Sequence, residues 1–332
     1  MPLWLSVVVA VVLGALVSVQ ARVSAALAQR SDVYNAAWVT VVVGTVLLIG
    51  VLLLSGGARR GVRSVASGLR RRTLPWWVLV AGLCGIFFVV TQGTAAGALG
   101  LAVFGMSVVA GQVVGGLLFD GMGLTGGDRR RPTRLRVLGS LLAVAAVGWG
   151  GLADGGARLA VLPILMAFAA GLGLALSAGV TGRINATSNN PAATGLVNHL
   201  VGLAVISAIL AGGARGGVRG FRLPGEPWLY VGGVIGPIGV ALTAVLVSSL
   251  GVLLLGLGMV AGQLLGALVI EAVAPTASGG IHPASVAGVV VTLLAVALTS
   301  LDGRLGRRAG ARGVRADGAG SRASEGTSPA TG

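Results

Sequence analysis

Cysteine and histidine are scarce in this sequence and lysine is absent, and the scarcity of the first two argues against several kinds of chemistry. The only cysteine, Cys84, lies in an apolar run and cannot form an internal disulfide. The only histidines are His199 and His282, which leaves too few residues for a histidine and cysteine metal site. We therefore expect no redox or zinc chemistry, no bound metal and no cofactor.

Charge is also scarce, and this decides the class of protein. Hydrophobic residues make up 55% of the 332 residues and charged residues only 10%, with a mean hydropathy of +0.94. So little polar surface cannot coat a soluble globule, so the chain is expected to lie in a membrane. Because a spanning helix needs roughly 20 apolar residues, about ten spans would use nearly the whole chain.

The net charge of +15 raises the alternative of nucleic-acid binding. All basic residues are arginines, however, and they stand between apolar runs instead of on one face. This pattern is typical of the positive-inside rule, by which basic residues are enriched in short cytoplasmic loops. We therefore expect the lipid bilayer, and no nucleic acid, as a partner.

Ten apolar runs predict ten helices and an orientation. With the N-terminus in the cytoplasm, the arginine clusters of 59–72 and 129–136 and the arginine-rich tail all lie inside, which predicts cytoplasmic termini and a multi-pass protein of the plasma (inner) membrane. The runs are 3–21, 33–54, 75–92, 98–119, 137–153, 159–180, 191–212, 227–246, 248–270 and 284–301.

The first run has an alternative reading as a cleaved signal peptide. Ala26-Leu27-Ala28 before Gln29 has the small residues of a cleavage site. Against this, the segment before the run carries no basic residue, and its loss would remove a helix that has a counterpart in the second half.

An internal repeat relates the two halves of the chain. Residues 99–120 align without gaps on 250–271, so that Val109-Ala110-Gly111-Gln112 recurs as Val260-Ala261-Gly262-Gln263. Gly115 matches Gly266, and Asp120 matches Glu271. Weaker echoes are Pro75-Trp76 with Pro227-Trp228 and Arg22 with Arg183. We expect a first repeat at 1–156, a second at 157–302 and a disordered basic cytoplasmic tail at 303–332.

Five helices in each half would make the second half insert upside down relative to the first. Such inverted repeats place a substrate site near the bilayer midplane and allow alternating access. The sequence thus predicts an all-α membrane protein of about ten transmembrane helices in two inverted five-helix repeats. The alternative is that duplication only made a larger bundle, as in some channels and scaffolds.

The Ala-Gly-Gln motif with a glycine three positions later, followed by an acid and present once in each five-helix half, also carries a family resemblance. Over residues 3–302 the chain resembles the YdcZ-like inner-membrane exporters of the drug/metabolite transporter superfamily, in a form that fuses two halves. The resemblance implies a ten-helix transporter, in the direction of export. Small multidrug exporters of that superfamily use a glutamate within the membrane, which has no counterpart in this sequence.

The acids of this chain fall at the ends of the runs or in loops, which argues against an enzyme. Asp120 and Glu271 would lie on opposite faces of the membrane and could not share a proton, and we expect Asp120 to pair with an arginine of 129–136. No nucleophile elbow, metal-binding triplet or Walker sequence occurs, so neither acyl transfer nor ATP-driven pumping is expected.

Polar residues inside the runs are the candidates for a transport pathway, because polar groups in hydrocarbon need partners. Gln112 and Gln263 lead, and the alternative is that they only join helices. His199 is the one group deep in a run that could titrate near neutral pH, and its alternative interpretation is a neutral histidine hydrogen-bonded to a neighbouring helix. Further pathway candidates are Asn198, Gln20, Thr40 and Gln92, and the expected helix-packing residues are Gly111, Gly115, Gly262 and Gly266.

The leading function from sequence is a secondary transporter that exports a small organic metabolite or drug across the inner membrane. A non-transporting interaction or scaffold protein, or a channel, is the alternative. Because both halves lie in one chain, we expect it to act as a monomer.

Overall fold

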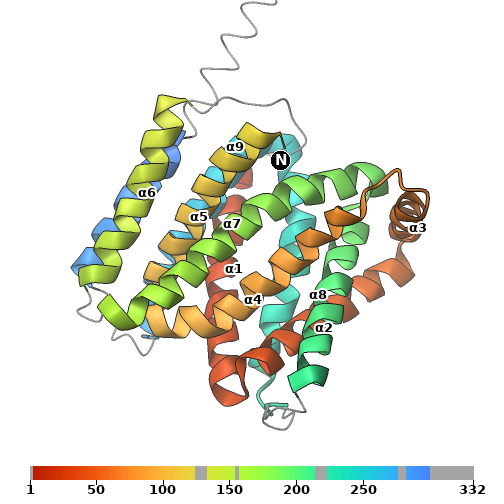
Figure 1. The fold of residues 1–332 in the computed structure, drawn as a ribbon, viewed down its shortest axis with the longest axis horizontal. Helices are drawn as coiled ribbons and strands as arrows, with labels where there is room; N and C mark the ends of the chain where they lie inside the picture. The colour runs from red at the N-terminus through yellow and green to blue at the C-terminus, as the bar shows by residue number, and fades with distance from the viewer. Residues whose placement is uncertain (1–2, 124–132, 154–156, 214–222, 276–281, 300–332) are drawn as a thin grey trace, which may run out of the picture.

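The computed structural model describes residues 3–123, 133–153, 157–213, 223–275 and 282–299, and these residues form helices and short connections without a strand (Figure 1). The expectation of an all-α protein is confirmed for them. The expected tail at 303–332 and Arg129 to Arg131 lie outside the described residues. The helices are α1 (Leu3–Arg30), α2 (Val33–Leu54), α3 (Gly56–Arg70), η1 (Trp76–Leu79), α4 (Val80–Leu99), α5 (Leu101–Met122), α6 (Arg134–Ala153), α7 (Ala157–Ser188), α8 (Pro191–Gly213), η2 (Pro227–Tyr230), α9 (Val231–Val273) and a last helix at Pro283–Thr299.

Seven helices of the described residues are long and apolar enough to cross a membrane, and two shorter apolar helices lie at Pro227–Thr243 and Pro283–Thr299. Their outward surface suits lipid, since large apolar side chains such as Leu162, Val269 and Leu294 are exposed. α3, between α2 and α4, was not among the predicted apolar runs. Its sequence has few large apolar residues and several arginines, so the hydropathy that marks a span could not reveal it.

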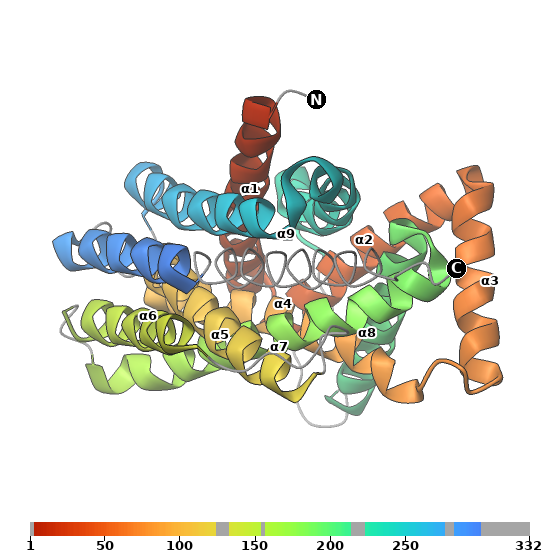
Figure 2. The ribbon, with the colours of Figure 1, turned by 90° about the horizontal axis from the view of Figure 1, so that it is seen from above.

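Two predicted spans, 227–246 and 248–270, largely fall within the single helix α9, which has 43 residues. At 1.5 Å per residue it is about 65 Å long, roughly twice the hydrocarbon core of a bilayer. Figure 2 shows its first part nearly end-on and its second part lying across the view, so α9 bends. In the first half, the corresponding pair α4 and α5 is separated at Gly100, whose φ of 77° suits a residue without a side chain.

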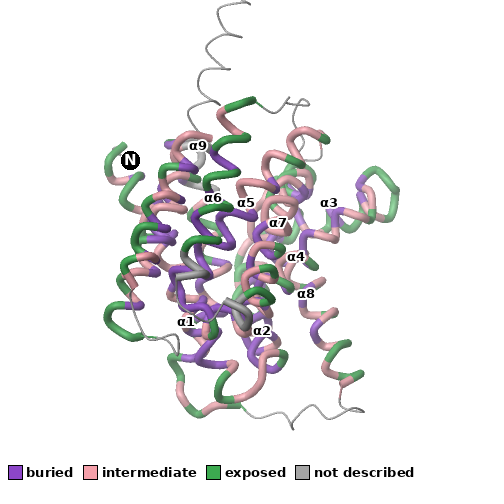
Figure 3. Tube along the Cα trace, turned by 60° about the vertical axis from the view of Figure 1, so that its left-hand side comes forward, coloured by how far each residue is buried: buried purple, intermediate pink, exposed green. Residues whose placement is uncertain are grey.

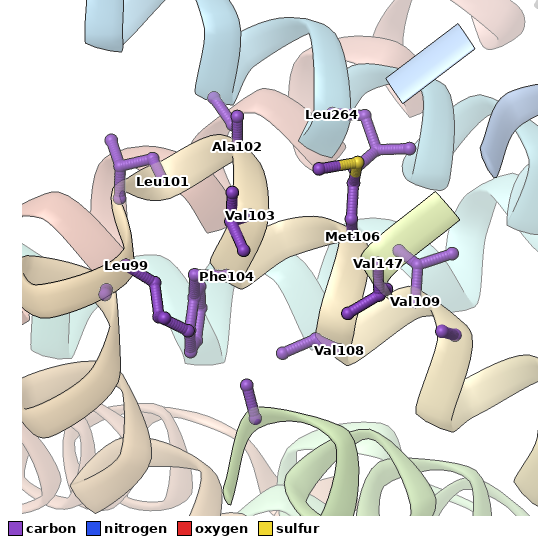
Figure 4. Packing of buried hydrophobic residues seen from close by; sticks show 14 of the residues in the cluster. Leu99, Leu101, Ala102, Val103, Phe104, Met106, Val108, Val109, Val147 and Leu264 are labelled. Atoms are coloured by element: carbon purple, nitrogen blue, oxygen red, sulfur yellow. The ribbon is translucent and has the colours of Figure 1, made fainter. Parts of the chain in front are cut away.

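The core of the fold surrounds α5. Every residue from Leu101 to Gly111 is buried, which is typical of a helix with neighbours on all sides. Figure 4 shows Met106 of α5 and Leu264 of α9 beside one another in this cluster, with Val147 of α6 close by. The segment that carries the first Gln/Gly motif is therefore the most enclosed helix of the described bundle.

Helices of one half pack along helices of the other in a reciprocal pattern. α1 lies along α9 and α5 along α7, each through a pair of glycines. A Cβ on Gly262 would lie 1.8 Å from the Val11 oxygen, and one on Gly111 would lie 2.0 Å from the Phe168 oxygen. The approach is equally close from the other side, where a Cβ on Gly14 or Gly171 would lie 1.9 or 2.1 Å from the facing carbonyl. Backbones come this close only where side chains are missing.

A second reciprocal pair of glycine contacts joins α4 to α8 and the first part of α9 to α2. A Cβ on Gly82 would lie 2.6 Å from the Asn198 oxygen, and one on its repeat counterpart Gly233 would lie 2.5 Å from the Thr40 oxygen. These contacts make Asn198 the counterpart of Thr40. The same register makes Val41 the counterpart of His199, so the histidine has no histidine counterpart in the first half.

The ends of the repeats correct two matches made from sequence. The 3₁₀ turns begin at Trp76 and at Pro227, so the counterpart of Trp228 is Trp77 and not Trp76. Each of these tryptophans lies under an arginine: the Arg183 guanidinium carbon is 5.0 Å from the Trp77 ring centroid, and that of Arg30 is 5.5 Å from Trp228.

The glycine contacts of α1 and α7 likewise pair Gly14 with Gly171, one helical turn away from the match of Arg22 with Arg183. A helix slipped by one turn keeps its apolar face, so an apolar pattern cannot distinguish the two alignments.

The two acids that end the motif helices have separate partners. Asp120 accepts a hydrogen bond from Arg136 Nη2 at 2.7 Å, which confirms the expected pairing with an arginine of 129–136. Glu271 is buried, and its Oε2 accepts from the Leu101 backbone N–H at 2.7 Å, so it caps the N-terminus of α5. Leu101 and Asp120 are nineteen residues apart on one helix, about 28 Å, so the two acids do not form a dyad.

Candidate functional site

The crossing of α2 and α8 holds the one deep histidine. His199 Nδ1 lies 2.9 Å from the Gly195 oxygen one turn earlier, which fixes the ring against its own helix. The opposite edge of the ring faces α2, where a Cβ on Gly44 would lie 2.8 Å from His199 Nε2. The same Cβ would lie 3.0 Å from the Gly233 oxygen of α9. His199 is thus enclosed by helices from both halves.

Asn198 precedes His199 and turns toward α7. Its amide nitrogen donates to Thr181 Oγ1 at 3.0 Å, while its Oδ1 is buried and has no hydrogen-bond partner within the described part of the chain. A buried acceptor without a partner costs about 1–3 kcal/mol, so a polar partner at this oxygen would be stabilising.

Two weaker candidates lie on the same side of the bundle. Thr40 is buried, and its hydroxyl donates to the Ala36 oxygen of its own helix at 2.9 Å, while its backbone oxygen faces Gly233. Gln20 of α1 lies beside the preceding residue of α9, since a Cβ on Gly232 would be 3.9 Å from Gln20 Cγ. The structure therefore brings Gln20, Thr40 and His199 to neighbouring positions around Gly232 and Gly233.

Gln92 stands apart from this group, between α1 and α4. Its side chain is 0% exposed, and its Oε1 accepts from Ser24 Oγ at 3.5 Å. Its Nε2 has no hydrogen-bond partner among the described residues, and the same holds for the buried Nε of Arg22 on α1. The first predicted apolar run, 3–21, ends just before Arg22. The structure places it inside α1, because that helix continues to Arg30.

Gln112 and Gln263 lie at the two reciprocal helix crossings. A Cβ on Gly171 would lie 3.0 Å from the backbone nitrogen of Gln112, and one on Gly14 would lie 2.8 Å from the backbone nitrogen of Gln263. Ser18 of α1 donates to the Gln263 backbone oxygen at 2.6 Å. Gln263 is 8% exposed and Gln112 is half-buried. Both residues sit where one half packs on the other, which suits the pathway and the packing interpretation alike.

The expected packing glycines all lie at helix contacts. A Cβ on Gly115 would lie 2.8 Å from Ala175 Cβ, and one on Gly266 would lie 2.8 Å from Ala15 Cα. Sequence reasoning missed their partners Gly14 and Gly171, and also Gly44 beside His199. Aligning the halves on glycines instead of arginines would have found the first two.

The chemistry available to these residues is binding. Their side chains offer amides, hydroxyls and one imidazole, and the described residues contain no group of three or more His, Cys, Asp or Glu that could hold a metal ion. Such groups can orient a polar ligand between helices that pack without bulky side chains.

Comparison with known proteins identifies the family. A family model described as "Putative inner membrane exporter, YdcZ" matches residues 5–148 and 162–298, one match in each half. No curated protein and no solved structure matches the chain. The resemblance drawn from the Gln/Gly motif is confirmed, and an exporter is a transporter and not an enzyme. The chain therefore belongs to this YdcZ family of inner membrane exporters, as a multi-pass helical membrane protein with two matched halves.

Proposed function

We propose that the chain is a secondary transporter that exports a small organic molecule by alternating access between two inverted repeats. The observation that carries this proposal is the reciprocal packing of the halves. α1 crosses α9 at Gly14 and Gly262 in the way that α7 crosses α5 at Gly171 and Gly111. A two-fold relation between halves gives two equivalent arrangements of one bundle, which alternating access requires.

The repeats of this proposal span 1–156 and 157–302, with both termini in the cytoplasm. The arginine–tryptophan contacts support the inversion: Arg183 and Trp77 lie near the arginine-rich α3, while Arg30 and Trp228 lie at the connection of α1 to α2. The spanning helix α2 separates the connection of α1 to α2 from α3. The counterparts Trp77 and Trp228 therefore lie at opposite faces of the membrane, as inverted repeats require. A cysteine introduced at Ser55, with Cys84 replaced by Ala, should react with a membrane-impermeant maleimide only after the cells are opened. Labelling in intact cells would contradict this orientation.

Around His199, two coupling mechanisms are compatible with the geometry. A proton-coupled transporter needs a group that changes charge between access states, and His199 lies between halves where such a change could be sensed. A facilitator needs no such group, and the bond of Nδ1 to the Gly195 oxygen suits a structural histidine. The variant His199→Gln, which keeps a polar side chain of similar reach, separates these cases. Loss of pH-driven accumulation with retained counterflow establishes coupling through His199, and intact pH-driven accumulation excludes His199 as the carrier. A facilitator shows no pH-driven accumulation in the wild type, and the variant keeps its counterflow rate.

The function itself is tested by ligand stabilisation followed by flux. The purified chain is screened by thermal shift against metabolite and drug libraries, and each stabilising compound is then measured in proteoliposomes. A transporter should show counterflow, in which unlabelled compound inside accelerates uptake of labelled compound outside. Flux without such acceleration would indicate a channel. If every stabilising compound fails to show flux, the chain is a scaffold and the proposal is contradicted.

A further inference from the structure

Helix α3 lies across the ends of α7 and α8, at the right-hand edge of the bundle in Figure 2. Its inward face consists of small residues that allow close contact. A Cβ on Gly61 would lie 2.8 Å from Ala193 Cβ and 2.9 Å from the Ser188 oxygen, and one on Gly68 would lie 3.3 Å from Leu74 Cβ. Together with the buried Ala58 and Val65, these contacts fix which face of α3 points outward.

The outward face of α3 is a row of arginines. At about 100° per residue, Arg59, Arg63 and Arg70 fall within about 40° of one another and opposite the buried face, in a row about 16 Å long. All three are exposed, as are Arg60 and the following Arg71 and Arg72 (Figure 3 shows exposed positions along this segment in green). We call these six residues the α3 arginine surface.

No acid neutralises this surface within the described residues. The sequence has no Asp or Glu between Asp32 and Asp120, and the ion pairs of the described residues, Arg30 with Glu226 and Arg136 with Asp120, do not involve α3. Arg59 Nη1 makes a hydrogen bond to the Leu53 oxygen at 3.3 Å, which leaves its other donors outward.

The neighbours of α3 place it at the level of lipid headgroups. Leu54, at the end of α2, is 92% exposed, and Trp76, at the start of η1, is 78% exposed. Both belong to apolar helices that suit hydrocarbon, and tryptophan is enriched at the membrane–water interface. An arginine row between two such residues therefore lies at the height of the phosphate groups.

We propose that the α3 arginine surface binds the headgroups of anionic phospholipids. Guanidinium groups bind phosphate through paired N–H donors, and basic residues near an anionic membrane surface each contribute attraction. The chain itself offers few partners for this surface, because it has only 9 acidic residues against 24 basic ones. An anionic lipid surface, by contrast, can contact every arginine of the row at once.

The test is a lipid titration of the full chain in neutral detergent micelles. Acyl-labelled phosphatidylglycerol and phosphatidylcholine are added separately, and each apparent Kd is measured by fluorescence. The wild type should bind phosphatidylglycerol at least tenfold more tightly than phosphatidylcholine. The triple variant R59Q/R63Q/R70Q should lose most of this preference, while R59K/R63K/R70K, which keeps the charge, should retain it.

A matched control removes three arginines of the tail. R304Q/R307Q/R308Q lowers the net charge equally and should keep the preference. An unchanged Kd for phosphatidylcholine and an unchanged size-exclusion profile show that the α3 variant is folded. The proposal is overturned if the α3 variant keeps its preference, if the tail variant loses as much, or if excess inorganic phosphate displaces the lipid. Binding is measured without transport, so its outcome is independent of the proposed function.

Discussion

Alanine at Gly262 or Gly111 should destabilise the folded chain by at least about 2 kcal/mol, which is the scale of overpacking a core. The added methyl would lie 1.8 Å from the Val11 oxygen in the first case and 2.0 Å from the Phe168 oxygen in the second. Both obstacles are backbone atoms, which cannot turn aside as a side chain can. The helices must separate, and the close contact between halves is lost along its length.

Thermal melting in detergent, followed by size-exclusion chromatography, measures this effect. Gly256→Ala in α9 and Gly116→Ala in α5 are matched controls, because a Cβ at either position has nothing within 4 Å. Alanine also has the higher helix propensity by about 1 kcal/mol, so the controls should melt at the wild-type temperature or above it. Equal melting of Gly262→Ala and Gly256→Ala would show that α1 and α9 do not pack as closely as described.

The sequence predicted the parts of this fold that depend on hydropathy and on exact repetition. An apolar run must become a helix in lipid, because only a helix satisfies its own backbone groups there, so most runs reappear as helices. Gln112 and Gln263 were paired correctly because glutamine is rare in such helices, so the two glutamines fix the register of the glycines around them. Asp120 was expected to pair with an arginine of 129–136 because these residues follow it at the same end of the bundle, and the structure gives Arg136 as its partner.

The parts that the sequence did not predict depend on geometry that hydropathy does not encode. α3 was missed because a helix that packs through glycines and presents arginines has no apolar run. Leu101 and Glu271 are distant in sequence, so the cap on α5 could not be read from it. Gln92 and Asn198 were named as polar residues, but only the structure shows that each has one buried atom without a partner among the described residues.

Replacing Gln112 and Gln263 together by leucine should lower the initial rate of flux at least tenfold while leaving folded protein in the membrane. Leucine is close to glutamine in size and suits an apolar surrounding, so the crossings with α7 and α1 can remain packed. What is lost is the pair of amides, the groups able both to donate and to accept hydrogen bonds at equivalent positions of the two halves. If one amide binds the substrate in each access state, the double leucine variant has no binding amide in either state.

The measurement is uptake of the compound found by ligand screening, in proteoliposomes that contain equal amounts of folded protein. Gln29→Leu is the matched control, because Gln29 is an exposed glutamine at the end of α1 and its loss should leave flux unchanged. The variant Q112N/Q263N retains amides on shorter side chains and should keep part of the rate. If the double leucine variant transports at the wild-type rate, the glutamines serve packing alone. In that case the pathway has to be sought around His199 and Asn198, where the other polar candidates of both halves meet.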